Sequence, residues 1–271
     1  MGKRCENGSC SHTLGAVAPA VTVRSLEVRY RGAVALTDVD LDVAEGSTLA
    51  VIGPNGSGKS TLLKSIAGVV DPTAGSVALG RGVAPALVLQ STDVDRHVPI
   101  SVRDTVRMAR YATLGLFRRF GPADSAAVDG AMRRLAVEHL ADRQLHELSG
   151  GQRQRVLVAQ GLAQGAPVLL LDEPVNGLDL RSQALILDVV ESERAGGRAV
   201  VMTTHDLGEA RRCDHVLLLD TAPIAWGTPA EVLCEEHLQS AFGGRFQRLG
   251  DDLVLDDPHH HDHELDVPWH R

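Results

Sequence analysis

A glycine-rich loop near the start of the chain constrains the fold more than any other feature. The apolar run 48–52 before it favours a buried central strand, and residues 60–69 after it carry apolar side chains at helical spacing. Glycines let the backbone curl so that successive N–H groups point inward at phosphate oxygens. The sequence therefore predicts a triphosphate site between a strand and a helix. The loop reads Gly53-Pro54-Asn55-Gly56-Ser57-Gly58-Lys59-Ser60 and is followed by Thr61.

The polar residues at the end of this loop have separate predicted tasks. Lys59 is expected to reach the β- and γ-phosphates of ATP, and the Ser60 hydroxyl to join the shell of a Mg²⁺ ion. The chain uses lysine only at positions 3, 59 and 64, so a lysine here suits the need for a compact ammonium. The alternative is a glycine-rich turn with an incidental lysine. The predicted strand and helix on either side favour the phosphate loop.

A second motif follows the apolar run 167–171, where two carboxylates, Asp172 and Glu173, stand side by side. It resembles the Walker B motif of phosphate-loop enzymes. Asp172 is expected to hold Mg²⁺ through water, and Glu173 to orient or deprotonate the attacking water. The alternative is an acidic pair that caps the next element. The phosphate loop upstream favours the catalytic interpretation.

The rest of the chain alternates strands and helices, which predicts an α/β fold with a parallel sheet covered by helices. The two helices between Gln90 and Leu148 indicate an inserted helical subdomain. We expect a flexible arm over 1–20, one domain over 21–242 with the helical subdomain at about 92–150, and a His/acid-rich tail over 243–271. The expected strands are 21–30, 34–43, 48–52, 85–90, 167–172, 198–203 and 215–219, and the expected helices are 60–69, 101–114, 123–140, 150–164, 181–194 and 228–237.

Composition excludes several classes of protein. No apolar run approaches the roughly 20 residues that cross a bilayer, and no apolar segment follows Lys3 and Arg4 as in a signal peptide. We therefore expect a cytoplasmic domain. The net charge of −8 argues against a nucleic-acid partner. The four cysteines are too few and too scattered for a disulfide framework, so we expect free thiols.

The residues Leu148-Ser149-Gly150-Gly151-Gln152 precede a predicted helix. With this pentapeptide the chain resembles the ATP-binding cassette (ABC) ATPases, whose motifs it carries in the family's order. The resemblance implies a P-loop NTPase (RecA-like) core with an N-terminal antiparallel β subdomain and an inserted α-helical subdomain. It also implies a homodimer, in which Ser149, Gly150, Gly151 and Gln152 bind the γ-phosphate of ATP held by the second copy.

The same resemblance assigns roles to four more residues. Gln90 matches the Q-loop, which touches the metal-bound water, so Ser60, Gln90 and Asp172 form the expected Mg²⁺ set. His205 matches the switch histidine and Asp179 the D-loop residue that crosses the dimer. Tyr30 matches the aromatic residue that stacks on adenine, its alternative being a core tyrosine. A lone histidine is usually a surface or core residue, so His205 depends on its place in the motif order.

One cassette without a membrane segment leaves two classes open: the energy subunit of a transporter with a separate permease, or a soluble ABC ATPase. The short helical insert resembles that of importers. Residues 98–106 and 140–145 further resemble the importers of manganese, zinc or iron. This implies that the partners are an integral membrane permease and, indirectly, an extracellular substrate-binding protein, with the chain peripheral on the cytoplasmic membrane face. Siderophore or cobalamin import and efflux remain alternatives. Leu89 and the pair Val175-Asn176 depart from the family pattern.

The C-terminal segment places four histidines, His259, His260, His261 and His263, among acidic residues. Imidazole and carboxylate groups suit transition-metal ions. The alternative is a solvated polar tail. The sequence leaves both interpretations open.

Overall fold

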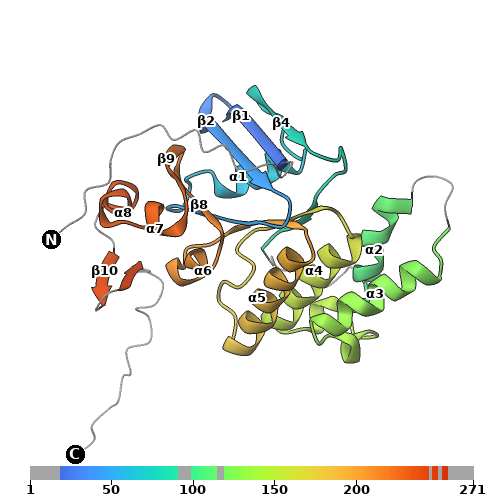
Figure 1. Ribbon diagram of the computed structural model, residues 1–271. Helices are drawn as coiled ribbons and strands as arrows, with labels where there is room; N and C mark the ends of the chain where they lie inside the picture. The colour runs from blue at the N-terminus through green and yellow to red at the C-terminus, as the bar shows by residue number, and fades with distance from the viewer. Residues whose placement is uncertain (1–18, 91–98, 115–118, 244–245, 250–251, 256–271) are drawn as a thin grey trace, which may run out of the picture.

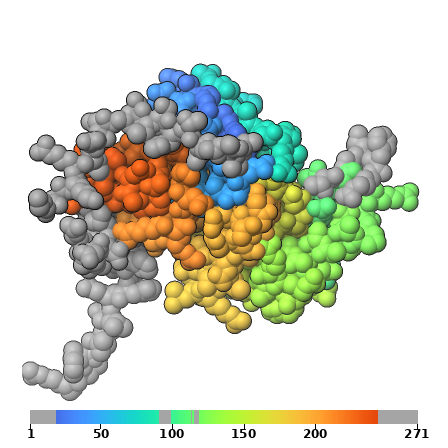
Figure 2. All heavy atoms as spheres, in the orientation of Figure 1, coloured from blue at the N-terminus to red at the C-terminus, as the bar shows by residue number. Residues whose placement is uncertain are grey.

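The computed structural model describes residues 19–90, 99–114, 119–243, 246–249 and 252–255. Three units make up the fold: a central sheet with its helices, a small antiparallel sheet, and a helical subdomain (Figure 1). In the space-filling view the helical subdomain forms a lobe at one end of the molecule (Figure 2). Among the described helices, none is both long and apolar enough to span a bilayer.

The central sheet has six strands, of which five run parallel and the last is antiparallel. Strands distant in sequence are neighbours, so the carboxyl ends of β3, β6 and β7 meet at one edge. The predicted parallel sheet is thus confirmed, while the antiparallel edge strand was not predicted. The strand order is β5 (Ala86–Val88), β6 (Val168–Leu171), β7 (Ala199–Thr203), β3 (Thr48–Ile52), β8 (His215–Asp220) and β9 (Ala222–Gly227).

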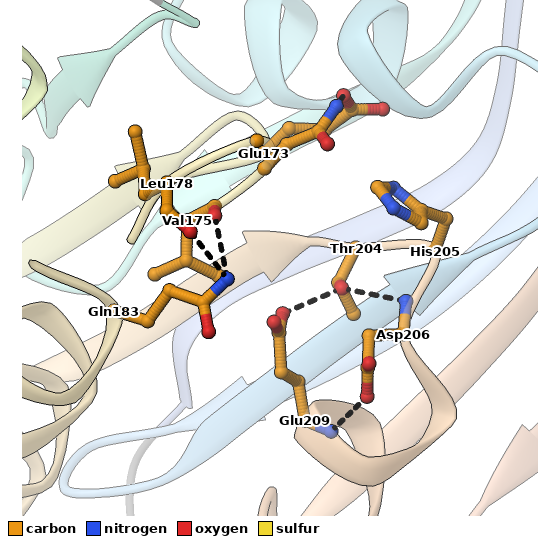
Figure 3. A pocket seen from close by; sticks show the side chains of 10 residues that line it. Glu173, Val175, Leu178, Gln183, Thr204, His205, Asp206 and Glu209 are labelled. Atoms are coloured by element: carbon orange, nitrogen blue, oxygen red, sulfur yellow. Dashed lines mark hydrogen bonds between the residues drawn. The ribbon is translucent and has the colours of Figure 1, made fainter. Parts of the chain in front are cut away.

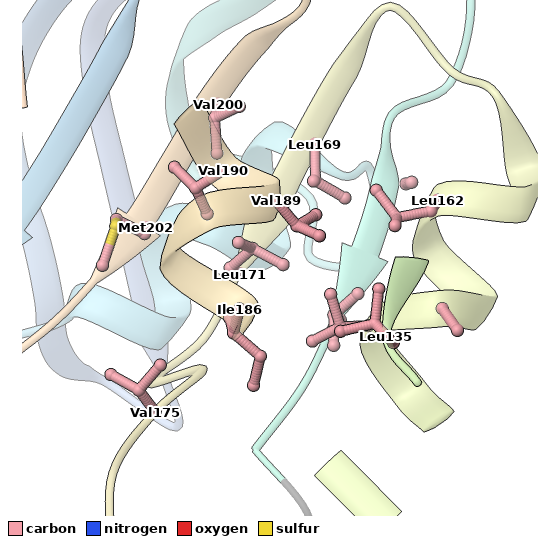
Figure 4. Close-up of a cluster of buried hydrophobic side chains, with 14 of the residues drawn as sticks. Leu135, Leu162, Leu169, Leu171, Val175, Ile186, Val189, Val190, Val200 and Met202 are labelled. Atoms are coloured by element: carbon pink, nitrogen blue, oxygen red, sulfur yellow. The ribbon is translucent and has the colours of Figure 1, made fainter. Parts of the chain in front are cut away.

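Both faces of this sheet are buried, because alternate residues of each strand enter two different cores. In β6, Leu169 and Leu171 pack into the larger core, and Val168 and Leu170 into the smaller one. The larger core joins the sheet to the helical subdomain, and Figure 4 shows Leu135 and Leu162 in the same cluster as Leu169. This two-sided burial explains why the central strands are uniformly apolar.

The antiparallel sheet lies on the side of the smaller core. Its strand order is β2 (Ala33–Ala44), β1 (Pro19–Tyr30) and β4 (Ala74–Leu79). These strands cover α1 (Lys59–Ile66), whose Leu62, Leu63 and Ile66 are fully buried in that core. The expected arm 1–20 therefore ends too late, since Pro19 already pairs with β2, and residues 1–18 lie outside the described part of the chain.

The helical subdomain contains α2 (Val102–Leu114), α3 (Pro122–Arg134) and α4 (Gly150–Gln164). The predicted helix 123–140 is too long, because α3 ends at Arg134 and Ala136 has a left-handed backbone with φ of 50°. Arg155 of α4 donates from Nη1 to the carbonyls of Leu135 (2.9 Å) and Ala136 (3.2 Å) and so binds the end of α3. Short 3-10 turns, η1 (Glu138–Leu140) and η2 (Leu145–Glu147), complete the segment.

Four helices and a hairpin complete the structure. They are α5 (Leu180–Ala195), α6 (Leu207–Arg211), α7 (Pro229–Val232), α8 (Glu235–Phe242), β10 (Phe246–Leu249) and β11 (Asp252–Leu255). The predicted helix 228–237 is wrong as a single element, since Leu233 leaves the helical region and α8 starts anew after Cys234. The β10–β11 pairing also corrects the expected His/acid-rich tail over 243–271, because both of these strands lie within it.

Candidate nucleotide site

The phosphate loop joins β3 to α1 in a conformation that only glycine permits at Gly58. This residue caps α1 with φ of 99°, and a Cβ atom there would lie 2.5 Å from the carbonyl oxygen of Ala35. Lys59 turns its ammonium back into the loop, where Nζ donates to the carbonyl oxygens of Gly53 (2.8 Å) and Pro54 (3.0 Å). The loop therefore holds the Lys59 ammonium against its backbone carbonyls, and the expected contacts of its N–H groups and of Lys59 with phosphate oxygens stay a prediction.

Burial sets the electrostatics of this loop. Removal from water lowers the pKa of the Lys59 ammonium, and the negative charges of Glu173 and Asp172 oppose that shift. Ser57 Oγ is also buried, and it has no hydrogen-bond partner among the described residues. The buried Lys59 ammonium is a good fit for an anion with several oxygens.

Asp172 connects the loop to two strands. Its Oδ1 accepts hydrogen bonds from Ser60 Oγ of α1 (3.1 Å) and from Thr203 Oγ1 of β7 (2.7 Å). Hydroxyl and carboxylate oxygens are the donor atoms that Mg²⁺ prefers, so Ser60 and Asp172 fit that ion. Gln90 is exposed just beyond β5, and residues 91–98 after it lie outside the described part. Thr203 was not identified from sequence, because a threonine at a strand end carries no signal by itself.

Glu173 has a strained backbone in the left-handed region, with φ of 45°. Such a conformation costs about 1–2 kcal/mol for a residue with a Cβ atom, and residues of this kind cluster at functional sites. Two hydrogen bonds hold it. The Glu173 N–H donates to Thr203 Oγ1 (2.8 Å), and Asn176 Nδ2 donates to the carboxylate Oε2 (2.9 Å).

A cavity of about 490 Å³ opens beside these residues, and Glu173 and His205 both line it (Figure 3). His205 lies two residues beyond the end of β7 and is half-buried. Gln183 of α5 donates to the carbonyls of Leu178 (3.1 Å) and Val175 (3.5 Å), which fixes the loop after Glu173. The structure thus brings two candidate catalytic residues, 32 positions apart in the numbering, to one cavity.

The pentapeptide at 148–152 caps α4. Ser149 Oγ accepts from the Gln152 N–H (3.3 Å), and Gln152 Oε1 accepts from the Ser149 N–H (3.1 Å). A Cβ atom on Gly151 would lie 3.1 Å from both Asp179 Oδ2 and Ser182 Oγ. Within its own chain, this segment therefore packs on the start of α5. Gly150 stands beside open space.

Asp179 also has partners within its own chain. Its Oδ1 accepts from the Ser182 N–H (3.0 Å) and its Oδ2 from Ser182 Oγ (2.8 Å), which caps α5. These bonds lower the pKa of the Asp179 carboxyl. The expected contact with a second copy involves a chain that the structure does not contain.

The remaining predicted residues lie partly within and partly outside the described part of the chain. Tyr30, at the end of β1, has 45% of its surface exposed, so the alternative of a core tyrosine is wrong. Pro54, Asn55, Gly56 and Thr61 lie in the loop and the first turn of α1, with Asn55 and Gly56 exposed. His259, His260, His261 and His263 lie outside the described residues, within which no group of three or more His, Cys, Asp or Glu side chains is placed to hold a metal ion.

A phosphate loop, a strand-end carboxylate pair and a capped glycine pentapeptide on this fold define a nucleotide-binding domain of the ATP-binding cassette class. Comparison with known proteins agrees, since residues 36–176 match the ABC transporter family. The zinc transport system ATP-binding protein TroB of Treponema pallidum is 38% identical over 239 residues, 86% of this chain and 90% of that protein. The chain therefore belongs to the ABC transporter family, as one of its ATP-binding proteins.

Two further comparisons point the same way. The manganese transport system ATP-binding protein MntA of Synechocystis sp. is 37% identical over 234 residues, 83% of this chain and 90% of that protein. A solved ABC transporter assigned to the metal-chelate type, in an inward-facing conformation, matches with a TM-score of 0.74 and 29% identity. That match covers 88% of this chain and 95% of the other chain. The expected P-loop NTPase core with its β and helical subdomains is thereby confirmed.

Proposed function

We propose that this chain hydrolyses ATP to drive import of a divalent metal ion, manganese, zinc or iron, through a separate membrane permease. The observation that carries the hydrolytic part is the convergence on Asp172. One carboxylate oxygen binds both Ser60 of the phosphate loop and Thr203, and Thr203 in turn accepts from the backbone of Glu173. A single network thus joins the phosphate-binding residues to the candidate base.

Binding of ATP would replace contacts within the loop. The Lys59 ammonium donates hydrogen bonds to the carbonyls of Gly53 and Pro54. On binding ATP it would exchange these for stronger charge-assisted hydrogen bonds to phosphate oxygens. Tyr30, exposed at the end of β1, would stack on the adenine ring. When bound, Mg²⁺ would neutralise phosphate charge, and Ser60, Asp172 and Gln90 are the residues that would hold it.

Hydrolysis needs a group that orients water against the γ-phosphate. Glu173 is the candidate, with its carboxylate fixed by Asn176 beside the cavity that His205 also lines. His205 would contact the γ-phosphate from the next strand. Both side chains stay outside the phosphate loop, so we assign them to turnover and Lys59 to binding.

The glycine pentapeptide supports a homodimer. Its glycines are the first two residues of α4, a 15-residue helix, and such a helix N-terminus binds anions through backbone N–H groups. In its own chain this segment packs on α5 at Ser182 and Asp179. We therefore propose that Ser149, Gly150, Gly151 and Gln152, with Asp179, complete the ATP site of a second copy.

The metal cargo is supported by the related proteins that transport manganese or zinc. Import of a metal ion also requires an integral membrane permease, and this chain would be peripheral on its cytoplasmic side. An extracellular binding protein would act on the chain only through the permease. The test is uptake of radioactive manganese, zinc and iron by cells that carry the parental or the Glu173→Gln chain. We expect uptake of at least one ion to be lost in the variant, while unchanged uptake of all three would refute metal import.

A further inference from the structure

Three hydrogen bonds form a closed ring around the peptide that carries His205. Thr204 Oγ1 donates to Glu209 Oε2 (2.6 Å) and accepts from the Asp206 N–H (3.0 Å). The ring closes where Asp206 Oδ1 accepts from the Glu209 N–H (2.9 Å). Figure 3 shows Glu209 and the His205 imidazole on opposite sides of Thr204, with the imidazole toward Glu173. The two neighbours of His205 in sequence are therefore both engaged with Glu209.

The ring is hydrogen-bonded to the strand that precedes the phosphate loop. The Thr204 N–H donates to the carbonyl of Val51 (3.1 Å), in the strand that leads into the loop. Thr204 itself is almost fully buried, with 3% of its surface exposed. His205 is thus attached on one side to the strand before the phosphate loop and on the other to Glu209 of α6.

The Glu209 carboxylate has no part in capping α6. The cap is made by Asp206 Oδ1 with the Glu209 backbone, and the Glu209 carboxylate contributes nothing to it. Instead the carboxylate is half-buried, which raises its pKa through loss of solvation. A carboxylate held out of water is costly unless its hydrogen bonds are satisfied, and Thr204 supplies the bond that the structure places there.

We propose that Glu209 is a positioning residue, which fixes the loop of His205 so that the imidazole faces the γ-phosphate site. This inference rests on the catalytic role proposed above for His205. Glu209 lines the cavity from the side of α6 and acts on the reaction through Thr204 and Asp206. Its loss should lower the turnover number while the Michaelis constant for ATP stays unchanged, because the phosphate loop is untouched.

The experiment measures steady-state ATP hydrolysis by the full chain for Glu209→Ala, Glu209→Gln, His205→Ala and the double variant of His205→Ala with Glu209→Ala. Misplacement of a catalytic group by about 1 Å can cost about a hundredfold in rate, so Glu209→Ala should lose about ten- to a hundredfold in kcat with KM within about twofold. Glu209→Gln should retain most of the rate, since its amide oxygen still accepts from Thr204. Glu236→Ala, at an exposed glutamate of α8, is the matched control.

The double variant separates this inference from the proposed function. If Glu209 works through His205, the double variant hydrolyses ATP as slowly as His205→Ala alone. Losses that multiply, or full activity of Glu209→Ala, would overturn the role of Glu209. Full activity of His205→Ala would instead overturn the role of His205. Should Glu209→Ala fail to fold, Thr204→Val removes the bond to Glu209, together with the bond from the Asp206 N–H, with little change in shape. This variant must then show at least the loss of kcat expected for Glu209→Ala.

Discussion

The side-chain amide of Asn176 donates a hydrogen bond across 2.9 Å to the carboxylate of Glu173, whose own backbone has φ of 45°. The residue that departs from the family pattern thus holds the candidate catalytic base. Its donor lies three positions further along the same loop, which Gln183 attaches to α5. A strained backbone and a fixed carboxylate together give Glu173 one orientation at the cavity.

Asn176→Ala should therefore reduce turnover and leave nucleotide binding intact. The carboxylate loses a fixed donor, and a hydrogen bond of this kind contributes about 1 kcal/mol, or about fivefold in kcat. The measurement is kcat and the dissociation constant for ATP, determined separately. A variant with a weaker affinity and an unchanged kcat would contradict the assignment of Asn176 to Glu173.

Lys59→Ala should abolish ATP binding, because the triphosphate loses the buried cation at the centre of its loop. We expect affinity to fall by about a hundredfold or more, as for loss of a desolvated charge partner. Titration calorimetry measures it, with Lys64→Ala on the same helix as the control. If the two variants bind ATP equally well, the loop is not the triphosphate site.

Gly151→Ala should impair turnover without affecting the ATP affinity of the monomer. The added methyl would meet Asp179 and Ser182 at 3.1 Å, so these side chains or the start of α4 must give way slightly. We expect about a tenfold loss of kcat, equivalent to about 1.4 kcal/mol. Gly130→Ala is the control, since a Cβ atom there meets open space within α3. Equal activity of both variants would show that the close packing has no role.

The thiol of Cys213 should resist alkylation in the native protein. Burial raises its pKa from 9.0 to about 12, and the thiolate is the reactive form. A rise of three units reduces the thiolate fraction about a thousandfold at a pH of about 8. Peptide mass mapping after iodoacetamide treatment should find Cys213 modified only in denaturant. Rapid modification in the native state would contradict this environment.

Local patterns in the sequence were sufficient to predict the phosphate loop and its flanking elements. The strand 48–52 was placed at its observed bounds, because a fully buried strand has an uninterrupted apolar run. The strand β4 lies outside the expected strands for the opposite reason: its residues Ala74–Leu79 are all exposed or half-buried. The adjacent pair Asp172 and Glu173 is predictable for a similar reason, because it directly follows an apolar run in the sequence.

Features that depend on distant contacts were beyond sequence reasoning. The early end of α3 depends on Arg155, which binds carbonyls 20 and 19 positions away. Thr203 is recognisable only once β6 and β7 are paired, because its hydroxyl meets Asp172 across 31 positions. The hydrogen-bonded ring at Glu209 spans only a few positions in sequence. Its residue types are nevertheless common at helix starts, so the sequence pattern does not distinguish this ring from an ordinary helix cap.

We propose that the phosphate loop and the capped pentapeptide are two halves of one ATP site shared between two copies. Light scattering of the Glu173→Gln chain with ATP and Mg²⁺ measures this association. Because this variant should bind ATP and stop hydrolysis, we expect a mass of about twice 28.9 kDa with ATP and 28.9 kDa without nucleotide. A variant that binds ATP yet remains at 28.9 kDa at every protein concentration would contradict the shared site.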